Sequence, residues 1–193
     1  MDALRLPDTR LVVEAEAVAR AALPRALLNH SVRTFLLAQA YAKVARIDCD
    51  IEGLAVASLF HDLGLCEPYR DRRRPFTFNS SRAMVAFLDQ HHVPAPRVAA
   101  LVDAVDFHFE LWPRWQAGPE AGLLHVGAYM DVLGARRSRI RADATRIDQH
   151  YSRQGLVTTF VSRALRSIGS PLSVVGLMLP TRCRRPHRPR PAL

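Results

Sequence analysis

The sequence predicts an all-α fold, a single-domain helical bundle, on three observations. Apolar residues recur three and four positions apart over several segments that are long enough to be helices. No segment has the alternating pattern of a strand or the turn signal of a hairpin. The chain has 193 residues, of which 49% are hydrophobic and 23% charged; this suffices for one hydrophobic core and is too short for two.

Two long helices are predicted near the N-terminal end, separated by a proline. The pattern from Thr9 to Leu23 has helical spacing and stops at Pro24, whose ring cannot continue a helix. The segment from Arg25 to about Arg46 is rich in Ala and Leu and has no internal Gly or Pro. His30 lies in the first third of this segment, so we expect a helix to hold it.

A third predicted helix is buried. Ile51–Phe60 is almost wholly apolar, and Asp48 or Asp50 can cap its first turn by accepting hydrogen bonds from free backbone N–H groups. Gly64 interrupts the pattern shortly afterwards. We therefore expect His61–Asp62 to project from the end of this helix at the edge of the core.

Loops and helices alternate in the rest of the chain. Residues 65–79 contain two prolines and the run Arg70–Arg74, and residues 112–119 contain Trp, Gly and Pro, so both segments are typical of loops. Asn79, Ser80 or Ser81 is expected to cap the helix that follows the first loop. This helix is expected to reach about residue 91, and further helices are expected over residues 96–105, 120–133, 136–150 and 156–168.

The net charge of +9 would suit a nucleic acid, but its distribution argues against that partner. Five arginines lie in residues 181–193, which leaves the body of the chain only mildly basic. This Arg/Pro-rich segment is expected to be a disordered tail. Nucleic acid is therefore an unfavoured partner.

The cysteines and the apolar stretches favour a cytoplasmic protein. Cys49, Cys66 and Cys183 are an odd number without Cys-x-x-Cys spacing, which predicts neither a disulfide framework nor a thiolate zinc site. The N-terminus carries Asp2 and Asp8 and lacks the basic start of a secretory signal. The longest apolar stretches are far shorter than the roughly 20 residues that cross a membrane.

Two histidines and two aspartates on predicted helices can converge on a divalent metal. His61–Asp62 is a common dipeptide by itself, but His30 lies on the preceding helix and Asp131 on a later one. Two imidazoles and two carboxylates form an open ligand set that suits Zn, Fe, Mn, Co or Ni and leaves positions for water. We expect one such ion, and the sequence does not select among these metals.

These residues resemble the ordered motif of the HD-domain metal-dependent hydrolases. The matching segments are Asn29–Arg33, His61–Gly64 and Tyr129–Gly134. The Asn-His-Ser start and the Asp-Val-Leu-Gly end are most similar to the cyanamide-hydratase-like subgroup. The resemblance spans about residues 25–135, and we expect the HD domain to occupy residues 25–170, after an N-terminal helix in residues 1–24. It also implies that the metal ligands are His30, His61, Asp62 and Asp131.

A water made nucleophilic by the metal is the chemistry that the resemblance implies. We expect a hydratase or hydrolase that acts on a small molecule, with cyanamide or a similar nitrile favoured. A phosphohydrolase acting on a nucleotide or another phosphomonoester is the first alternative. The second is a non-catalytic, metal-containing binding module.

Asp62, His108 and Glu67 are the candidate catalytic residues. His108 either positions substrate or transfers a proton, or it is a helix-end histidine bonded to a carboxylate. Glu67 is either a general acid or base or a solvated loop carboxylate. His91 and His92 could serve a second metal, but an exposed helix end explains them better. A homo-oligomer is compatible with the sequence.

Overall fold

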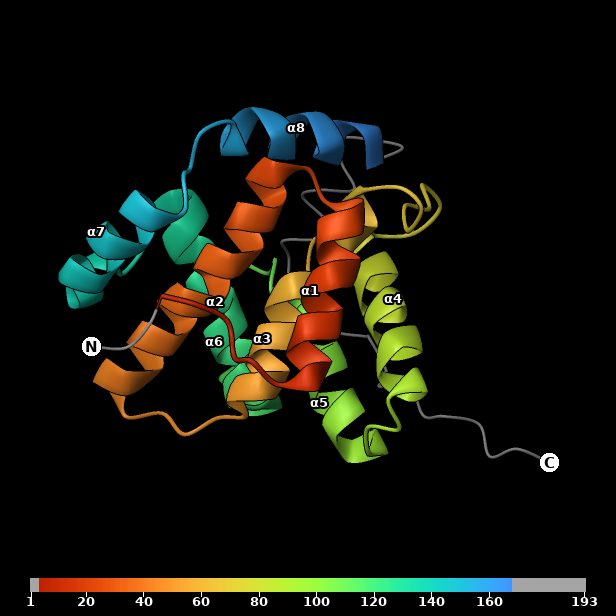
Figure 1. The fold of residues 1–193 in the computed structure, drawn as a ribbon, viewed down its shortest axis with the longest axis horizontal. Coiled ribbons are helices and arrows are strands. Elements are labelled where there is room, and N and C mark those ends of the chain that lie inside the picture. The colour runs from red at the N-terminus through yellow and green to blue at the C-terminus, as the bar shows by residue number, and fades with distance from the viewer. Residues whose placement is uncertain (1–3, 168–193) are drawn as a thin grey trace.

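The computed structural model describes residues 4–167, and within them the chain is all-helical (Figure 1). Eight α-helices and three short 3₁₀ turns, but no strand, occur in this range, which confirms the predicted fold class. The predicted tail at 181–193 lies outside the described residues. The α-helices are α1 (Arg10–Ala22), α2 (Arg25–Ala45), α3 (Ile51–Phe60), α4 (Phe76–Gln90), α5 (Ala95–Phe107), α6 (Pro119–Leu133), α7 (Arg141–His150) and α8 (Leu156–Ser167). The 3₁₀ turns are η1 (Leu63–Leu65), η2 (Trp115–Ala117) and η3 (Arg137–Ile140).

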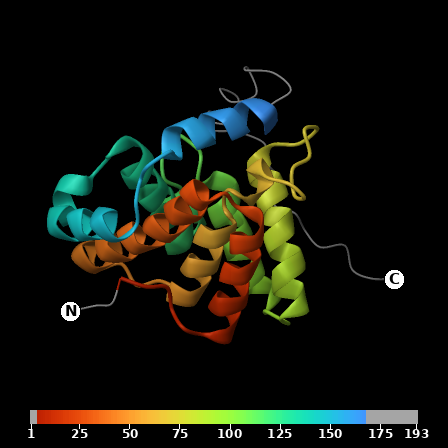
Figure 2. The same ribbon diagram turned by 45° about the horizontal axis from the view of Figure 1, so that its top comes forward.

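Helix α2 runs through the middle of the bundle and packs most extensively against α6 (Figures 1 and 2). The two backbones approach closely at Gly127 of α6, where a Cβ atom would lie 2.3 Å from the carbonyl oxygen of Thr34 on α2. Only glycine fits this crossing. Because His30 and Asp131 each lie one turn away from it, the close approach brings these two side chains within reach of each other.

Helix α3 is buried as predicted, with every residue from Gly53 to Phe60 inside the core. The side chain of Asp50 caps it, since Asp50 Oδ1 accepts a hydrogen bond of 2.9 Å from the backbone N–H of Gly53. Asp48, the other candidate cap, is exposed. The helix ends at Phe60 with His61 as its C-cap, so the pair His61–Asp62 directly follows a buried helix.

The predicted cap of α4 is wrong. The helix begins at Phe76 after Pro75, so Asn79 and Ser80 lie inside it. Their polar groups hold the preceding loop instead: Ser80 Oγ accepts a hydrogen bond of 2.9 Å from the Gly64 N–H, and Asn79 Nδ2 donates one of 2.9 Å to the Asp71 carbonyl. Long-range partners thus satisfy side chains that a local pattern assigns to a helix start.

The C-terminal part of the described chain wraps one end of the bundle. The helix predicted over 136–150 is divided into η3 and α7 at Ile140, whose φ of −132° and ψ of 34° are not helical, and Arg136 before η3 is left-handed with φ of 59°. Helix α8 crosses the top of the bundle in both views (Figures 1 and 2). Its Phe160 ring lies 6.1 Å from that of Phe109. Among the described helices, none is both long and apolar enough to span a bilayer.

Candidate metal centre

Three predicted ligands meet where the end of α3 faces α2. His30 Nε2 lies 3.2 Å from His61 Nε2 and 3.6 Å from Asp62 Oδ2, and His61 Nε2 lies 3.4 Å from the same oxygen. Each of the three side chains is about 1% exposed. These are the ligand-type atoms that could hold a metal ion together.

Hydrogen bonds from the described residues do not explain the burial of the Asp62 carboxylate. Within residues 4–167, neither Asp62 Oδ1 nor Oδ2 accepts a hydrogen bond, although both atoms are buried. An unsatisfied buried carboxylate is costly, so its persistence points to a bound cation. Ligand atoms about 2.0–2.1 Å from a tetrahedral zinc ion would be about 3.3–3.4 Å apart. The three measured separations are close to this spacing, so the residues fit a divalent ion.

The tautomers of both histidines suit this role. His61 Nδ1 lies 2.7 Å from the Ser58 carbonyl, and His30 Nδ1 lies 2.7 Å from Asp131 Oδ2. Each Nδ1 therefore carries the proton that it donates, which leaves the Nε2 lone pair facing the cluster. Burial lowers the pKa of His61 below its ordinary value, so the ring is neutral, as a ligand must be.

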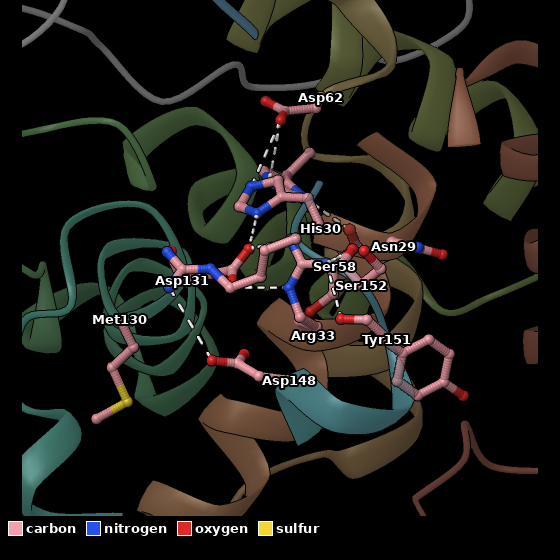
Figure 3. Close-up of polar contacts among 12 residues, drawn as sticks. Asn29, His30, Arg33, Ser58, Asp62, Met130, Asp131, Asp148, Tyr151 and Ser152 are labelled. Atoms are coloured by element: carbon pink, nitrogen blue, oxygen red, sulfur yellow. Dashed lines mark hydrogen bonds and ion pairs between the residues drawn. The ribbon is translucent and has the colours of Figure 1, made fainter. Parts of the chain in front are cut away.

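Asp131 lies on the far side of the His30 ring from Asp62 (Figure 3). Its oxygens form a bidentate pair with Arg33, at 2.8 Å from Arg33 Nε to Oδ1 and 2.7 Å from Nη2 to Oδ2. Burial alone would raise the pKa of Asp131, but the hydrogen bonds from His30 and Arg33 outweigh it and hold that pKa far below its usual range. The structure thus brings Asp131 to His30 but not into the group of converging ligand atoms.

Arg33 ties this pair to the end of α7. Arg33 Nη1 donates hydrogen bonds to the Ser152 carbonyl at 2.7 Å and to the Tyr151 carbonyl at 3.3 Å. Both Arg33 and Asp131 are fully buried. Arg33 lies one turn after His30 on α2, so the carboxylate that reaches His30 is also within reach of Arg33. The two carbonyl partners carry no signal in the sequence, because any residue offers the same backbone group.

His108, the C-cap of α5, also faces the cluster. Its Nδ1 lies 2.6 Å from the Val105 carbonyl, and its Nε2 lies 3.8 Å from Asp62 Oδ1. The His108 and His61 rings pack edge to face, with centroids 4.8 Å apart. Burial, helped by the neighbouring His61, lowers the pKa of His108 to about 3. The imidazole is therefore neutral throughout the physiological range.

The other sequence candidates lie outside the cluster. The Glu67 side chain is 64% exposed and pairs with Arg70, at 2.6 Å between Glu67 Oε1 and Arg70 Nη2. His91 pairs with Glu14 of α1 at 3.3 Å, and His92 is exposed.

The sequence matches the HD domain family over residues 27–136, more than half of the chain. No curated protein matches closely enough to count as a relative. The matched range runs from α2 to the end of α6 and contains the buried cluster described above. The chain therefore belongs to the HD-domain family.

Proposed function

We propose that this protein is a metal-dependent hydrolase or hydratase of a small molecule, with its reaction centre at His30, His61 and Asp62. The observation that carries the proposal is the Asp62 carboxylate, which is buried without a hydrogen-bond partner among the described residues and faces two imidazole Nε2 atoms. His30, His61 and Asp62 would hold a divalent ion, which when bound would act as a Lewis acid and supply hydroxide at neutral pH.

The protein's own residues bury the centre and fix its side chains. The Nδ1–H groups of His30 and His61 are fixed by hydrogen bonds to Asp131 and to the Ser58 carbonyl, which sets the orientation of both rings. The side chains at the centre are almost fully buried, so charge interactions there are screened far less than in water. A reacting molecule would therefore meet preoriented groups.

A small, uncharged nitrile such as cyanamide is the substrate class that we place first. The Arg33 guanidinium beside the centre is engaged with Asp131 and two backbone carbonyls, and Arg70 is paired with Glu67. A phosphate dianion would need such cations to neutralise it, whereas a nitrile does not. In the hydration, hydroxide oxygen bonds to the nitrile carbon, the C≡N bond order falls, and nitrogen takes up protons. The product of cyanamide is urea.

A phosphomonoester is the second candidate. HD-domain proteins are in general metal-dependent phosphohydrolases, and this chain belongs to that family. The run Arg70–Arg74, in the loop that follows the His61–Asp62 pair, would attract an anion from solution. In this reaction hydroxide would attack phosphorus, and the ester oxygen would leave with a proton.

One experiment separates the two candidates. The purified protein is loaded in turn with Zn, Fe(II), Mn, Co or Ni and incubated with cyanamide and with a panel of nucleotides and simple phosphomonoesters. Urea without phosphate supports the nitrile substrate, and phosphate release supports the second candidate. An Asp62→Ala variant serves as control and should lose both metal and turnover. If wild type and variant retain equal metal, the proposed centre is wrong.

A further inference from the structure

We propose that α8 is a movable lid over the centre, and that Phe160 on its inner face is the gate past which substrate enters. The inference rests on the proposed function for its reaction centre and adds the route by which a molecule reaches it. Such a route is needed, because His30, His61 and Asp62 are each about 1% exposed. A substrate cannot meet these side chains unless part of the protein moves.

The contacts of α8 place it next to the centre. The helix packs against η1, the turn that directly follows Asp62, and against α2. In both ribbon views it crosses the start of α2, the part of that helix that holds His30 (Figures 1 and 2). A Cβ atom at Gly155, the residue before α8, would lie 3.9 Å from that of Ala26, which is one turn before His30. Helix α8 therefore covers this side of the centre.

Three phenylalanine rings connect α8 to the side chains at the centre. The ring centroids of Phe160 and Phe109 lie 6.1 Å apart, and those of Phe109 and Phe76 lie 5.3 Å apart. Phe76 and Phe109 both pack against the His108 ring, with centroids 5.8 and 6.1 Å from it. Withdrawing Phe160 would therefore uncover Phe109, which lies directly against His108.

Few buried side chains hold α8 to the bundle. Among its described residues only Leu156 is buried, and Phe160 and Ala164 are partly buried on the same face. The hydroxyls of Thr158 and Ser162 donate to carbonyls of the preceding turn. By contrast, α2 and α3 are buried over much of their length. Moving α8 away exposes less apolar surface than moving α2 or α3, so it is the less costly opening.

The segment before α8 can act as a hinge, because one end of it is tied to α2. The Ser152 carbonyl accepts hydrogen bonds of 2.7 Å from Arg33 Nη1 and 3.3 Å from Asn29 Nδ2. Both donors lie within one turn of His30 on α2. Gly155 has φ of 75°, a left-handed conformation that favours glycine. The chain is thus fixed at Ser152 and can rotate at Gly155, immediately before the lid.

Cys66 provides a probe of lid opening within the protein itself. It is the C-cap of η1 and is 1% exposed. Burial raises the pKa of its thiol, and the charge of Arg163 on α8 opposes that rise, so the thiol lies close to the proposed lid. A buried thiol is inert until its cover opens. The rate at which Cys66 reacts with a thiol reagent therefore reports how often α8 moves away.

The test measures the reaction of Cys66 with a chromogenic disulfide reagent in metal-free protein. Cys49 and Cys183 are replaced by Ser, so Cys66 is the one thiol that remains. In this background we expect Phe160→Ala to react at least about tenfold faster, because loss of a partly buried ring favours the open state. The control Val161→Ala changes the adjacent side chain, which is 48% exposed, and should stay within about twofold of the parent.

The urea dependence of the rate separates lid opening from global unfolding. Lid opening exposes little surface, so the rate should rise weakly with urea, whereas reaction through the unfolded chain follows the full slope of equilibrium unfolding. Phe160→Leu and Phe109→Leu are milder variants of the same ring contact, which serve if Phe160→Ala does not fold. Each should raise the rate of Cys66, and the double variant should raise it by less than the product of the two.

A second measurement uses the metal-loaded enzyme and tests whether substrate passes the gate. The ratio of kcat/KM for a bulky substrate to that for the smallest active one should rise in Phe160→Ala and stay unchanged in Val161→Ala. The bulky and small substrates are two nitriles or two phosphomonoesters, according to the class that is turned over. An unchanged ratio in Phe160→Ala would mean that substrate does not enter past Phe160.

The outcomes keep this inference apart from the proposed function. The lid is refuted by an unchanged Cys66 rate in both Phe160 variants, by an equal rise in Val161→Ala, or by a urea slope equal to that of global unfolding. None of these rates requires metal or turnover. If the wild type binds no metal, the proposed function fails while the thiol rates still decide whether α8 opens.

Discussion

Arg33 and Asp131 form a buried ion pair whose energetic role can be measured separately from the metal. Both side chains are fully buried and joined by two hydrogen bonds of 2.7 and 2.8 Å. Replacing Arg33 by Met would leave the Asp131 charge inside the protein without its closest partner. We expect the metal-free protein to lose about 3–5 kcal/mol in its free energy of unfolding, as measured by urea denaturation at neutral pH.

Two comparisons make that result interpretable. Arg146→Ala breaks a pair with Asp143 in which both side chains are more than 40% exposed, and it should cost less than about 1 kcal/mol. The double variant Arg33→Met/Asp131→Leu removes both charges and should be more stable than Arg33→Met alone. A double variant as unstable as the sum of its singles would contradict the ion-pair explanation.

At the scale of residues, the sequence predicted which side chains come together. It did not predict which of their atoms face each other. His30, His61 and Asp62 converge, as the motif resemblance implied. Whether an Asp or His near such a cluster binds the ion depends on a ring orientation and on backbone carbonyl partners, which have no signature in a sequence. Asp131 and His108 are the two residues for which this matters, and only the fold distinguishes their positions.

At the scale of elements, the Asp50 cap links the start of α3 to α5. Arg97 of α5 donates to both oxygens of Asp50, at 2.5 and 2.8 Å. Burial alone would raise the pKa of Asp50, but the bonds from Arg97 and the Gly53 N–H outweigh it and lower that pKa below its ordinary value. A carboxylate with a lowered folded-state pKa stabilises the protein above its unfolded-state pKa, and this stabilisation is lost as the pH falls through the folded-state pKa.

Asp50→Asn should therefore flatten the pH dependence of stability in the acid range. We expect the free energy of unfolding to fall less steeply in this variant than in wild type between about pH 5 and pH 3. Loss of the cap in Asp50→Ala should cost about 0.5–2 kcal/mol at neutral pH. Asp48→Asn, two residues away and exposed, is the matched control and should keep the wild-type slope. Equal slopes in wild type and Asp50→Asn would count against the assignment.

The α2–α6 crossing gives a second prediction at this scale. In Gly127→Ala the new Cβ would meet the Thr34 carbonyl and the Ala38 Cβ, so the two helices must move apart. We expect a loss of about 1–3 kcal/mol, and also weaker metal binding because the His30–Asp131 hydrogen bond spans the same interface. Urea denaturation and competition with a chromophoric chelator measure the two effects.

Gly134→Asn provides the contrast for Gly127→Ala. Gly134 ends α6 with φ of 71°, and no atom of the described residues lies within 4 Å of the place that a Cβ atom would take there. Asn tolerates this left-handed conformation better than most residues. The variant should keep wild-type metal affinity. Equal losses in both variants would mean that the effect of Gly127→Ala is not specific to the crossing.

For the whole molecule, the order and class of the helices could be predicted from the apolar pattern, because burial against a common core makes α1 and α2 periodic and α3 almost wholly apolar. The predictions of helix boundaries were wrong where tertiary contacts determine the local backbone conformation. Ser80 was expected at a helix start and lies inside α4, bonded to Gly64. Between α6 and η3 both Gly134 and Arg136 are left-handed, and of these only the glycine is a residue type that predicts such a conformation.

Metal binding and folding should be coupled across the whole molecule, and Asp62→Asn should affect the metal-bound and metal-free proteins differently. An ion that binds only the folded chain adds about 4 kcal/mol when its free concentration is 1,000 times the Kd. For a chain of this size that raises the Tm by roughly 8–16 °C over the chelator-treated protein. Asp62→Asn should abolish the metal-dependent rise in Tm.

Without metal, however, Asp62→Asn should melt no lower than wild type, because it removes a buried carboxylate that lacks a hydrogen-bond partner within residues 4–167. Differential scanning calorimetry of both proteins, with and without metal, measures the four values. A metal-free Asp62→Asn protein much less stable than metal-free wild type would mean that Asp62 is held by the protein itself, and that the cluster is not built around an ion.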